Sequence, residues 1–147
     1  MILVDSNVVI DARISKSPYH RWAEEVIADA LSTTGIALNA IVFAELCVGQ
    51  EDHKSIEGQL IARGLKIIDI PAAAAPICAR AYTRYRLARK HSGGGAAPTI
   101  PLPDFFIGAH AELMGWPLAT RDTERYRRYF PNVKLIEPTR ARARGNG

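Results

Sequence analysis

The hydrophobic positions along the chain alternate between short apolar runs and longer segments with helical spacing. Five runs are typical of buried strands, at residues 1–4, 36–38, 65–70, 117–119 and 133–136. Between them, apolar side chains recur every three or four residues, as in helices with one buried face. The helices that this spacing predicts cover residues 6–14, 19–31, 40–48, 53–62, 72–91, 103–114 and 123–129.

The alternation of strands and helices indicates the fold class. Strand–helix–strand units are right-handed and place parallel strands side by side. We therefore expect an α/β, three-layer fold, with a parallel sheet of about five strands flanked by helices on both faces. In such sheets, ligands bind beyond the carboxyl ends of the strands. Residues that directly follow a strand, or that begin the next helix, are thus the first candidates for a functional site.

The length and charge of the chain suggest a single domain with an appended tail. The 147 residues contain no internal repeat, and we assign residues 1–137 to one domain and residues 138–147 to a disordered, Arg-rich tail. The net charge is +4, but three of the 19 basic residues lie in that tail. The other 16 nearly balance the 15 acidic residues, so net charge alone is weak evidence for nucleic-acid binding.

The cysteines and the hydropathy indicate a cytoplasmic protein. Cys47 and Cys78 are isolated in apolar segments, which is typical of buried thiols in a reducing compartment. No stretch approaches the roughly 18 apolar residues that a membrane span needs. Asp5 interrupts the first apolar run, and no basic segment precedes that run, so a signal peptide is not expected.

Four acidic residues occupy the positions that the fold class singles out. Asp5 directly follows the first strand, and Asp122 follows the fourth. Glu45 lies in the helix after the second strand, and Asp104 begins the helix after a glycine-rich loop at 92–98. Because the carboxyl ends of parallel strands meet at one edge of the sheet, we expect these four carboxylates to converge.

Such a cluster predicts a site for a hard metal ion. Two carboxylates about 4 Å apart repel each other by roughly 1–4 kcal/mol, depending on the local dielectric. A divalent cation reverses that sign, and oxygen ligands without His or Cys favour Mg²⁺ or Mn²⁺. Ions of this kind polarise phosphodiesters and lower the pKa of a bound water. The chemistry that the four acids predict is therefore phosphodiester hydrolysis.

Each acid also has a purely structural interpretation. Asp5 could cap the first helix, and Asp122 could cap the helix that starts at Thr123. Glu45 lies among apolar residues and could belong to a structural ion pair. Asp104 could be a favourable charge at a helix N-terminus.

The chain resembles PIN-domain ribonucleases of the VapC toxin type, which belong to bacterial type II toxin–antitoxin systems. The resemblance covers about residues 1–137 and rests on four motifs in the same order. They are Asp5-Ser6-Asn7, Glu45-Leu46 followed by Gly49, Asp104-Phe-Phe-Ile-Gly-Ala, and Thr120-Arg121-Asp122. Two features depart from the family pattern, namely the long glycine-rich loop at 92–98 and the Arg-rich tail.

The resemblance implies a PIN fold and a Mg²⁺- or Mn²⁺-dependent endoribonuclease that acts as a toxin on tRNA or rRNA. It implies that Asp5, Glu45, Asp104 and Asp122 form the catalytic metal site. It implies that Asn7 and Thr120 support that site by hydrogen bonding. It further implies a homodimer and a VapB-like antitoxin that inserts a segment into a groove, to which the early helices could contribute.

Several other polar residues allow more than one interpretation. Two basic clusters are interpreted either as solvated faces or as RNA contacts, with Arg84, Arg89, Arg121 and Arg125 as the candidates. Four tyrosines in the same segments could stack on bases, namely Tyr82, Tyr85, Tyr126 and Tyr129. Asp11 is expected mainly on a solvated helix surface, with a supporting role at the site as the alternative. The four histidines share no metal-ligand spacing, and His110 is expected to pack on its helix.

Two other functions remain open. A haloacid-dehalogenase-like phosphatase also carries an acid after its first strand, but Asn7 replaces the second acid that its chemistry needs, and Glu45 is left unexplained. A PIN-like module without activity could bind RNA or a partner, although such a module has no need for four acids. A dinucleotide-binding fold is disfavoured, because no Gly-x-Gly-x-x-Gly motif follows the first strand.

Overall fold

The computed structural model describes residues 1–139, which form a five-stranded sheet and seven helices. The strands are β1 (Ile2–Val4), β2 (Ile36–Asn39), β3 (Lys66–Ile68), β4 (Leu118–Ala119) and β5 (Leu135–Ile136). The helices are α1 (Ser6–Arg13), α2 (His20–Ser32), α3 (Ala40–Cys47), α4 (His53–Ala62), α5 (Ala74–His91), α6 (Pro103–Met114) and α7 (Glu124–Tyr129). From residue 140 on, the predicted tail lies outside the described residues.

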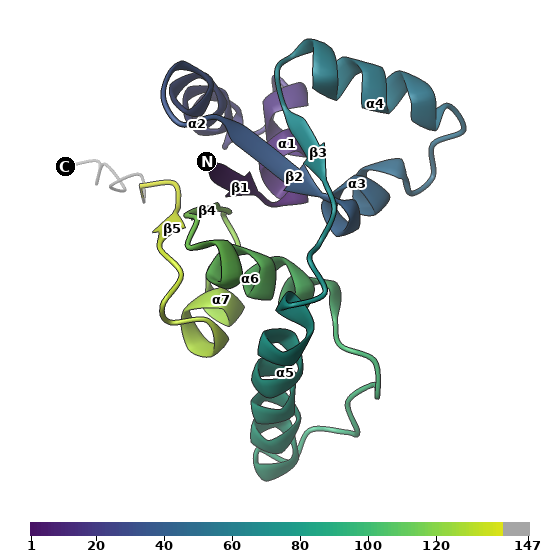
Figure 1. Ribbon diagram of the computed structural model, residues 1–147, viewed down its shortest axis with the longest axis vertical. Coiled ribbons are helices and arrows are strands. Elements are labelled where there is room, and N and C mark those ends of the chain that lie inside the picture. Colours follow the sequence, from purple (N-terminus) through teal and green to yellow (C-terminus); the bar gives the residue numbers. More distant parts are fainter. Residues whose placement is uncertain (140–147) are drawn as a thin grey trace, which may run out of the picture.

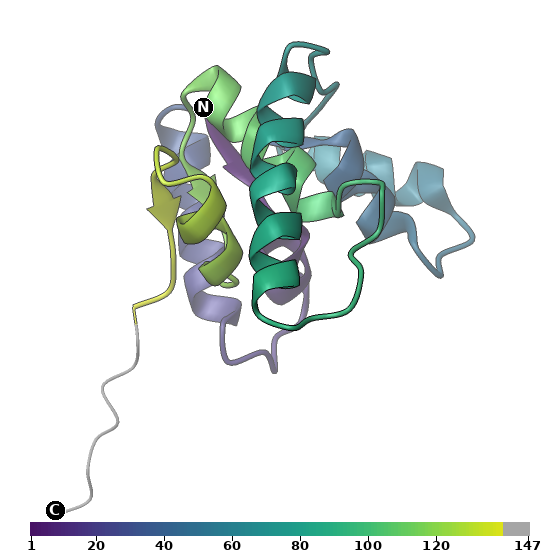
Figure 2. The ribbon, with the colours of Figure 1, turned by 90° about the horizontal axis from the view of Figure 1, so that it is seen from below.

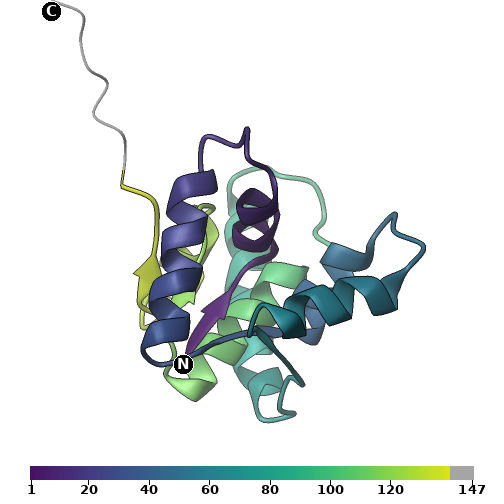
Figure 3. The same ribbon diagram turned by 90° about the horizontal axis from the view of Figure 1, so that it is seen from above.

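The sheet is parallel throughout and has the strand order β3-β2-β1-β4-β5 (Figure 1). Helices α5, α6 and α7 lie together on one side of it (Figure 2). Helices α1 and α2 lie on the other side (Figure 3). The expected three-layer α/β fold is therefore confirmed. Its core consists of aliphatic strand residues and buried aromatics such as Phe105, Tyr126 and Phe130.

Helices with clear end signals occur where the sequence predicts them. Both α4 and α6 match their predicted ranges residue for residue. Asp52 caps α4 by accepting a hydrogen bond from the Ser55 N–H at 2.9 Å. Pro103 begins α6, and Gly115 ends it with a φ of 64°, a left-handed conformation that suits glycine.

The edge strand β3 is shorter than the predicted run at 65–70. Among residues 1–139, its only partner is β2, and the last pair in their register joins Asn39 to Ile68. Beyond Asn39 the chain turns into α3, so residues after Ile68 have no strand to pair with. Helix α5 likewise begins two residues later than expected, because a turn after Pro71 precedes it.

The glycine-rich loop at 92–98 leaves the end of α5 and runs back alongside that helix (Figure 1). Arg89 donates from Nε to the Gly95 carbonyl at 2.8 Å, and Tyr82 donates to the Pro98 carbonyl at 2.6 Å. These two bonds anchor the loop that leads into α6. In the part of the chain described, no helix combines the length and the apolar character that crossing a membrane requires.

Candidate metal site at the ends of β1 and β4

Asp5 is the most strongly constrained acid of the predicted site. Its backbone N–H donates to the Ala119 carbonyl at 3.0 Å and so extends the pairing of β1 with β4. Only 5% of the residue is exposed. Its Oδ1 accepts from the Ser6 N–H at 2.8 Å, so Asp5 does cap α1. Capping uses only one of the two carboxylate oxygens, however.

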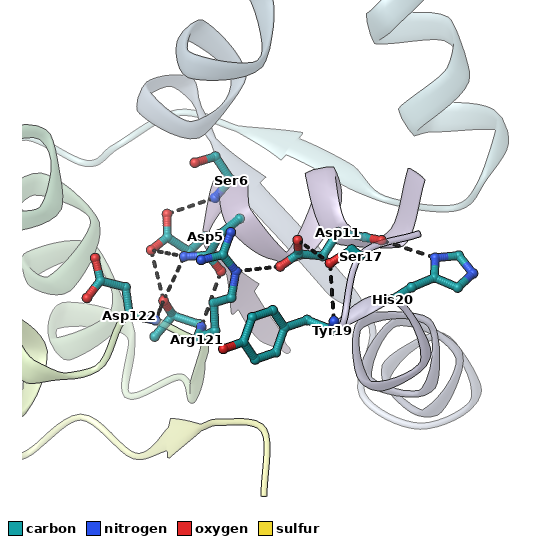
Figure 4. A network of polar contacts seen from close by, with 10 residues as sticks. Asp5, Ser6, Asp11, Ser17, Tyr19, His20, Arg121 and Asp122 are labelled. Carbon is teal, nitrogen blue, oxygen red and sulfur yellow. Dashed lines mark hydrogen bonds and ion pairs between the residues drawn. The ribbon is translucent and has the colours of Figure 1, made fainter. Parts of the chain in front are cut away.

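The second oxygen of Asp5 accepts three further hydrogen bonds. Thr120 Oγ1 donates to Oδ2 at 3.0 Å, Tyr126 Oη at 3.2 Å and Asn7 Nδ2 at 3.3 Å. Asn7 also donates to Thr120 Oγ1, which in turn accepts from the Asp122 N–H. Figure 4 shows the part of this network between Asp5 and Asp122, at the junction of β1 and the segment after β4. Asn7 and Thr120, the two predicted supporting residues, therefore both hydrogen-bond to Asp5.

Glu45 reaches the same region from α3. The side chain is half-buried, and its Oε2 accepts from Ser6 Oγ at 2.5 Å. Asn39 caps α3 by accepting from the Ile41 and Val42 N–H groups, each at 3.1 Å. The other end of the Asn39 amide lies 3.2 Å from His110 Nδ1, on α6. The Asn39–His110 contact therefore holds the helix of Glu45 against the helix of Asp104.

His110 is buried, and burial lowers its pKa, so the ring is neutral at physiological pH. Because the Asn39 amide nitrogen is a donor, His110 Nδ1 must be the acceptor, and the ring proton is assigned to Nε2. The sequence alone predicts only that His110 packs on its helix. The signal that could have revealed this link is a polar residue in each of two otherwise apolar segments, namely Asn39 at the end of the second strand and His110 in the helix that begins with Asp104.

Asp104 lies at the start of α6 and faces a cation from α7. Arg125 Nη1 is 3.0 Å from Asp104 Oδ2, and both side chains are about one-third exposed. Burial raises the pKa of Asp104, the nearby Arg125 lowers it, and the charge of Asp122 raises it. Asp104, Asp122 and Arg125 line one hollow of about 280 Å³. Asp122 is exposed at that hollow and does not cap α7, whose cap position is Thr123.

The charges of these acids are coupled. Burial raises the pKa of Asp5 to about 6, with further contributions from the negative charges of Asp104 and Glu45. Burial and the same three carboxylates raise the pKa of the Tyr126 hydroxyl well above its ordinary value. Tyr126 is therefore a permanent donor to Asp5. Asp5, Glu45 and Asp104 thus lie close enough to repel one another, and Asp122 acts mainly on Asp104.

A family model of the PIN domain matches residues 2–131 of the chain. The chain belongs to the PIN domain family. No match was found among curated proteins.

Solved structures share the fold of this PIN domain at low sequence identity. VapBC2 from Rickettsia felis, bound to a DNA fragment from its promoter, is similar over 95% of this chain and 100% of its own, with 23% identity and a TM-score of 0.61. DNA-bound VapBC from Salmonella typhimurium matches over 92% and 96%, with 22% identity and a TM-score of 0.63. VapC20 from Mycobacterium tuberculosis, described as a sarcin–ricin loop cleaving toxin, matches over 91% and 99%, with 14% identity and a TM-score of 0.58.

The donor chemistry of this PIN domain fits a hard divalent cation. The candidate ligands are carboxylate oxygens whose mutual repulsion a cation would relieve. Within residues 1–139, no three His, Cys, Asp or Glu side chains already stand in an arrangement that would hold a metal ion. Arg125 contacts Asp104 Oδ2 and Ser6 contacts Glu45 Oε2, so a bound cation would compete with these partners for the carboxylates.

Two expectations from the sequence are wrong. Asp11 is not solvated: it is buried, and its Oδ2 accepts from Arg121 Nε at 2.6 Å. Three of the tyrosines proposed for base stacking are core residues, namely Tyr82, Tyr126 and Tyr129. Tyr85 is half-buried and packs against Phe105. In each case the polar atom of the side chain favours an exposed position. A hydrogen-bond partner inside the protein or a cluster of aromatic rings stabilises the buried position instead.

The two predicted RNA-contact arginines of α5 also have partners within the protein. Arg84 Nη2 donates to the Tyr129 carbonyl at 2.8 Å, and Arg89 donates to Gly95 and to the Tyr85 hydroxyl. Their contact with RNA stays a prediction. The other two candidates lie at the acids themselves, with Arg125 on Asp104 and Arg121 directly before Asp122.

The raised pKa of Asp5 predicts how the stability of the metal-free protein depends on pH. The protonated form is favoured in the folded state, because the folded pKa is about 6 and the unfolded value is near 3.8. The resulting stabilisation is complete below the unfolded pKa and is lost as the pH rises through 6. A shift of about two units corresponds to roughly 3 kcal/mol. Urea unfolding in chelator between pH 4.5 and 7.5 measures this loss.

The control for this pH dependence is Asp5→Asn, which cannot titrate. Its free energy of unfolding should fall less between pH 5 and pH 7.5 than that of the wild type. Equal pH slopes for the two proteins would show that Asp5 titrates normally and that the acids are not coupled.

The Arg125–Asp104 pair predicts competition between Arg125 and a metal ion. Arg125→Gln is expected to bind Mn²⁺ about fivefold more tightly at pH 7.5, because a partly exposed ion pair is worth up to about 1 kcal/mol. Calorimetric titration measures the affinity. Arg21→Gln is the matched control, since Arg21 carries the same charge but lies exposed on α2, where it pairs with Glu25 and does not line the hollow of Asp104 and Asp122. An equal gain in both variants would mean that only net charge matters.

Proposed function

We propose that this PIN domain is a divalent-metal-dependent endoribonuclease and the toxin of a toxin–antitoxin pair. The observation that carries the proposal is the buried Asp5 carboxylate, which is held by four hydrogen bonds and coupled in charge to Asp104 and Glu45. A cation between the acids would offset their mutual repulsion, which is unfavourable without it. The fold likeness to VapBC structures supports the toxin assignment.

Asp5 and Asp104 would hold the principal Mg²⁺ or Mn²⁺, and Glu45 and Asp122 would complete the site. A divalent cation bound there supplies polarisation of the phosphodiester and lowers the pKa of a nearby water. Thr120 and Asn7 fix the orientation of Asp5 through its Oδ2. In the proposed reaction, water attacks the phosphorus in line, the P–O3′ bond breaks, and the products carry a 5′-phosphate and a 3′-hydroxyl.

Tyr126 has a defined part in this scheme. Its raised pKa keeps the hydroxyl protonated, so it donates to Asp5 and cannot remove a proton from water. Asn7 likewise donates its amide hydrogens to Asp5 and Thr120, which leaves no acid to protonate a leaving group as a haloacid-dehalogenase-like phosphatase would need. The arrangement therefore supports metal-assisted hydrolysis better than a covalent aspartyl-phosphate route.

A VapB-like antitoxin is the partner that we propose. Val9 of α1, Ile27 of α2 and Leu60 of α4 line a hollow of about 100 Å³, together with Leu65 just before β3. Ile10 and Ile14, on or just after α1, and Ile61, on α4, are exposed apolar side chains. An amphipathic antitoxin segment would bury such residues.

We further propose a homodimer that acts in the cytoplasm, where the RNA substrates are. Sedimentation of the purified protein measures its mass.

Cleavage of total bacterial RNA by the purified protein tests the proposed function. With Mn²⁺ or Mg²⁺ present, we expect a few discrete new 5′-phosphate ends in tRNA or rRNA, and chelator should abolish them. Mapping these ends names the target. If no new ends form and calorimetry detects no Mn²⁺ binding, the chain is a binding module without nuclease activity.

A further inference from the structure

A second hollow lies beside the candidate metal site, on the side of α2. It has a volume of about 780 Å³, within the roughly 300–1,000 Å³ of small-molecule sites. Its walls come from the start of α2, from the segment between β4 and α7, from α7 and from the residues after β5. The lining includes Tyr19, Trp22, Arg121, Arg127 and Glu137. We refer to it as the aromatic hollow.

The aromatic hollow adjoins the acids through the backbone. Arg121 directly precedes Asp122, and its N–H donates to Asn7 Oδ1 at 3.2 Å. Asn7 in turn hydrogen-bonds to Asp5. Figure 4 shows Asp122, Arg121 and Tyr19 in succession, from the acids toward α2. The hollow therefore adjoins the place where the proposed site would bind a phosphodiester.

Tyr19 is a partly exposed aromatic residue whose position is fixed by contacts with its neighbours. Its N–H donates to Ser17 Oγ at 3.1 Å, and Ser17 Oγ donates to the buried Asp11 at 2.8 Å. The Arg121 guanidinium lies over the Tyr19 ring, 5.1 Å from its centroid. Tyr19 is still 37% exposed, unlike the buried Tyr82, Tyr126 and Tyr129. The base-stacking role that the sequence assigned to those tyrosines is therefore available at Tyr19.

Two arginines supply positive charge at the aromatic hollow. Arg121 uses Nε for Asp11, and its side chain remains more than one-third exposed. Arg127 pairs with Glu137, but both side chains are largely exposed, so the pair is weak and can exchange Glu137 for another anion. A partly exposed aromatic ring with guanidinium groups close by is the combination that binds single-stranded nucleotides.

We propose that the aromatic hollow is a nucleotide subsite, which binds the RNA residue next to the cleaved phosphodiester. The base stacks on Tyr19 and Trp22, and its phosphate contacts Arg121 and Arg127. This inference rests on the proposed ribonuclease function and adds a substrate-positioning site to it. Binding of the base and phosphate in this hollow would fix which phosphodiester lies at the acids.

Trp22 provides a direct measurement of binding. The chain has two tryptophans, so Trp116→Phe leaves Trp22 as the single tryptophan fluorophore. In chelator, which prevents cleavage, a six-nucleotide single-stranded RNA should quench Trp22 with saturation. Tyr19→Ala in this background should weaken the affinity about tenfold, as expected for one lost base stack. Tyr19→Phe, which keeps the ring, should bind like its parent.

Two control variants separate the subsite from general electrostatic attraction. Arg127→Gln should weaken binding severalfold, whereas Arg21→Gln, an exposed arginine of α2 outside the hollow, should not. A triple Gln variant of Arg140, Arg142 and Arg144 should keep the quenching, and loss of the quenching in this variant would assign RNA binding to these arginines instead of the hollow. In cleavage assays, Tyr19→Ala should raise KM about tenfold and leave kcat nearly unchanged.

The results distinguish the subsite from the nuclease itself. If the protein cleaves RNA normally but RNA does not quench Trp22, the subsite proposal is wrong and the nuclease proposal stands. The same holds if RNA binds the Tyr19→Ala variant with the same affinity as the parent protein. Quenching by an antitoxin segment but not by RNA also overturns it. Quenching that Tyr19→Ala loses and Tyr19→Phe keeps supports the subsite even if the metal-dependent cleavage is absent.

Discussion

Asp104→Asn is expected to reduce metal-dependent RNA cleavage at least about a thousandfold, which corresponds to roughly 4 kcal/mol of transition-state stabilisation. The substitution removes one of the two acids proposed to hold the principal cation, with almost no change in shape. Cleavage rates at saturating Mn²⁺, compared with the wild type on the mapped RNA target, measure the effect. Calorimetry should show that Mn²⁺ binding is weakened in parallel.

The fold should survive this substitution. The Asp104→Asn variant would lose the ion pair with Arg125, but it would also lack a negative charge that raises the pKa of Asp5. We therefore expect the free energy of unfolding to change by no more than about 1 kcal/mol. Asp29→Asn, on the exposed surface of α2, is the matched control and should cleave at the wild-type rate. An Asp104→Asn protein that keeps a tenth of the activity would remove Asp104 from the site.

Gly108→Ala is expected to have the largest effect on stability. Gly108 lies on the buried face of α6, and an added Cβ would lie 2.4 Å from Phe130 Cδ2 and 2.5 Å from its Cε2. Phe130 is enclosed in the core and cannot turn away freely. Overpacking of this kind costs about 2–3 kcal/mol, or about 5–10 °C in Tm for a chain of this size. Thermal and urea unfolding measure both.

Gly58→Ala is the matched control for this effect. Gly58 is also inside a helix, α4, but no atom of the described part of the chain lies within 4 Å of its added Cβ. Alanine there should stabilise the protein by about 0.5–1 kcal/mol, because it favours the helix. In the Gly108→Ala background, Phe130→Leu should restore part of the lost stability. If Gly108→Ala unfolds like the wild type, α6 does not approach Phe130 as closely as the structure indicates.

The sequence predicts the fold well because the residues that start and end helices act locally. Asp52 and Gly115 begin or end helices through their own hydrogen bonds and φ values, so α4 and α6 are predicted to the residue. The length of β3 could not be predicted in the same way. It depends on where β2 ends, at Asn39, which is a property of a neighbouring strand and not of residues 65–70.

The candidate site shows the same division between local and tertiary information. The positions of Asp5 and Glu45 follow from the order of strands and helices, and the pKa of Asp5 reflects both Asp104 and Glu45. Which partner each polar side chain selects does not follow from that order. The Asp11–Arg121 pair joins residues 110 positions apart, and Arg125 reaches Asp104 from a helix 21 positions away. Only the packed structure brings these groups together.

The strand order has a consequence for when the site forms during synthesis. β1 pairs on one side with β2 and on the other with β4, which lies more than 110 residues later in the chain. Asp5 is emerging from the ribosome long before Thr120 and Tyr126, which donate to it, have been translated. A nascent chain that ends before β4 therefore lacks the partners of Asp5 as well as Asp122. The activity proposed here would be switched on only as translation of this protein nears its end, so interrupted synthesis would release harmless fragments.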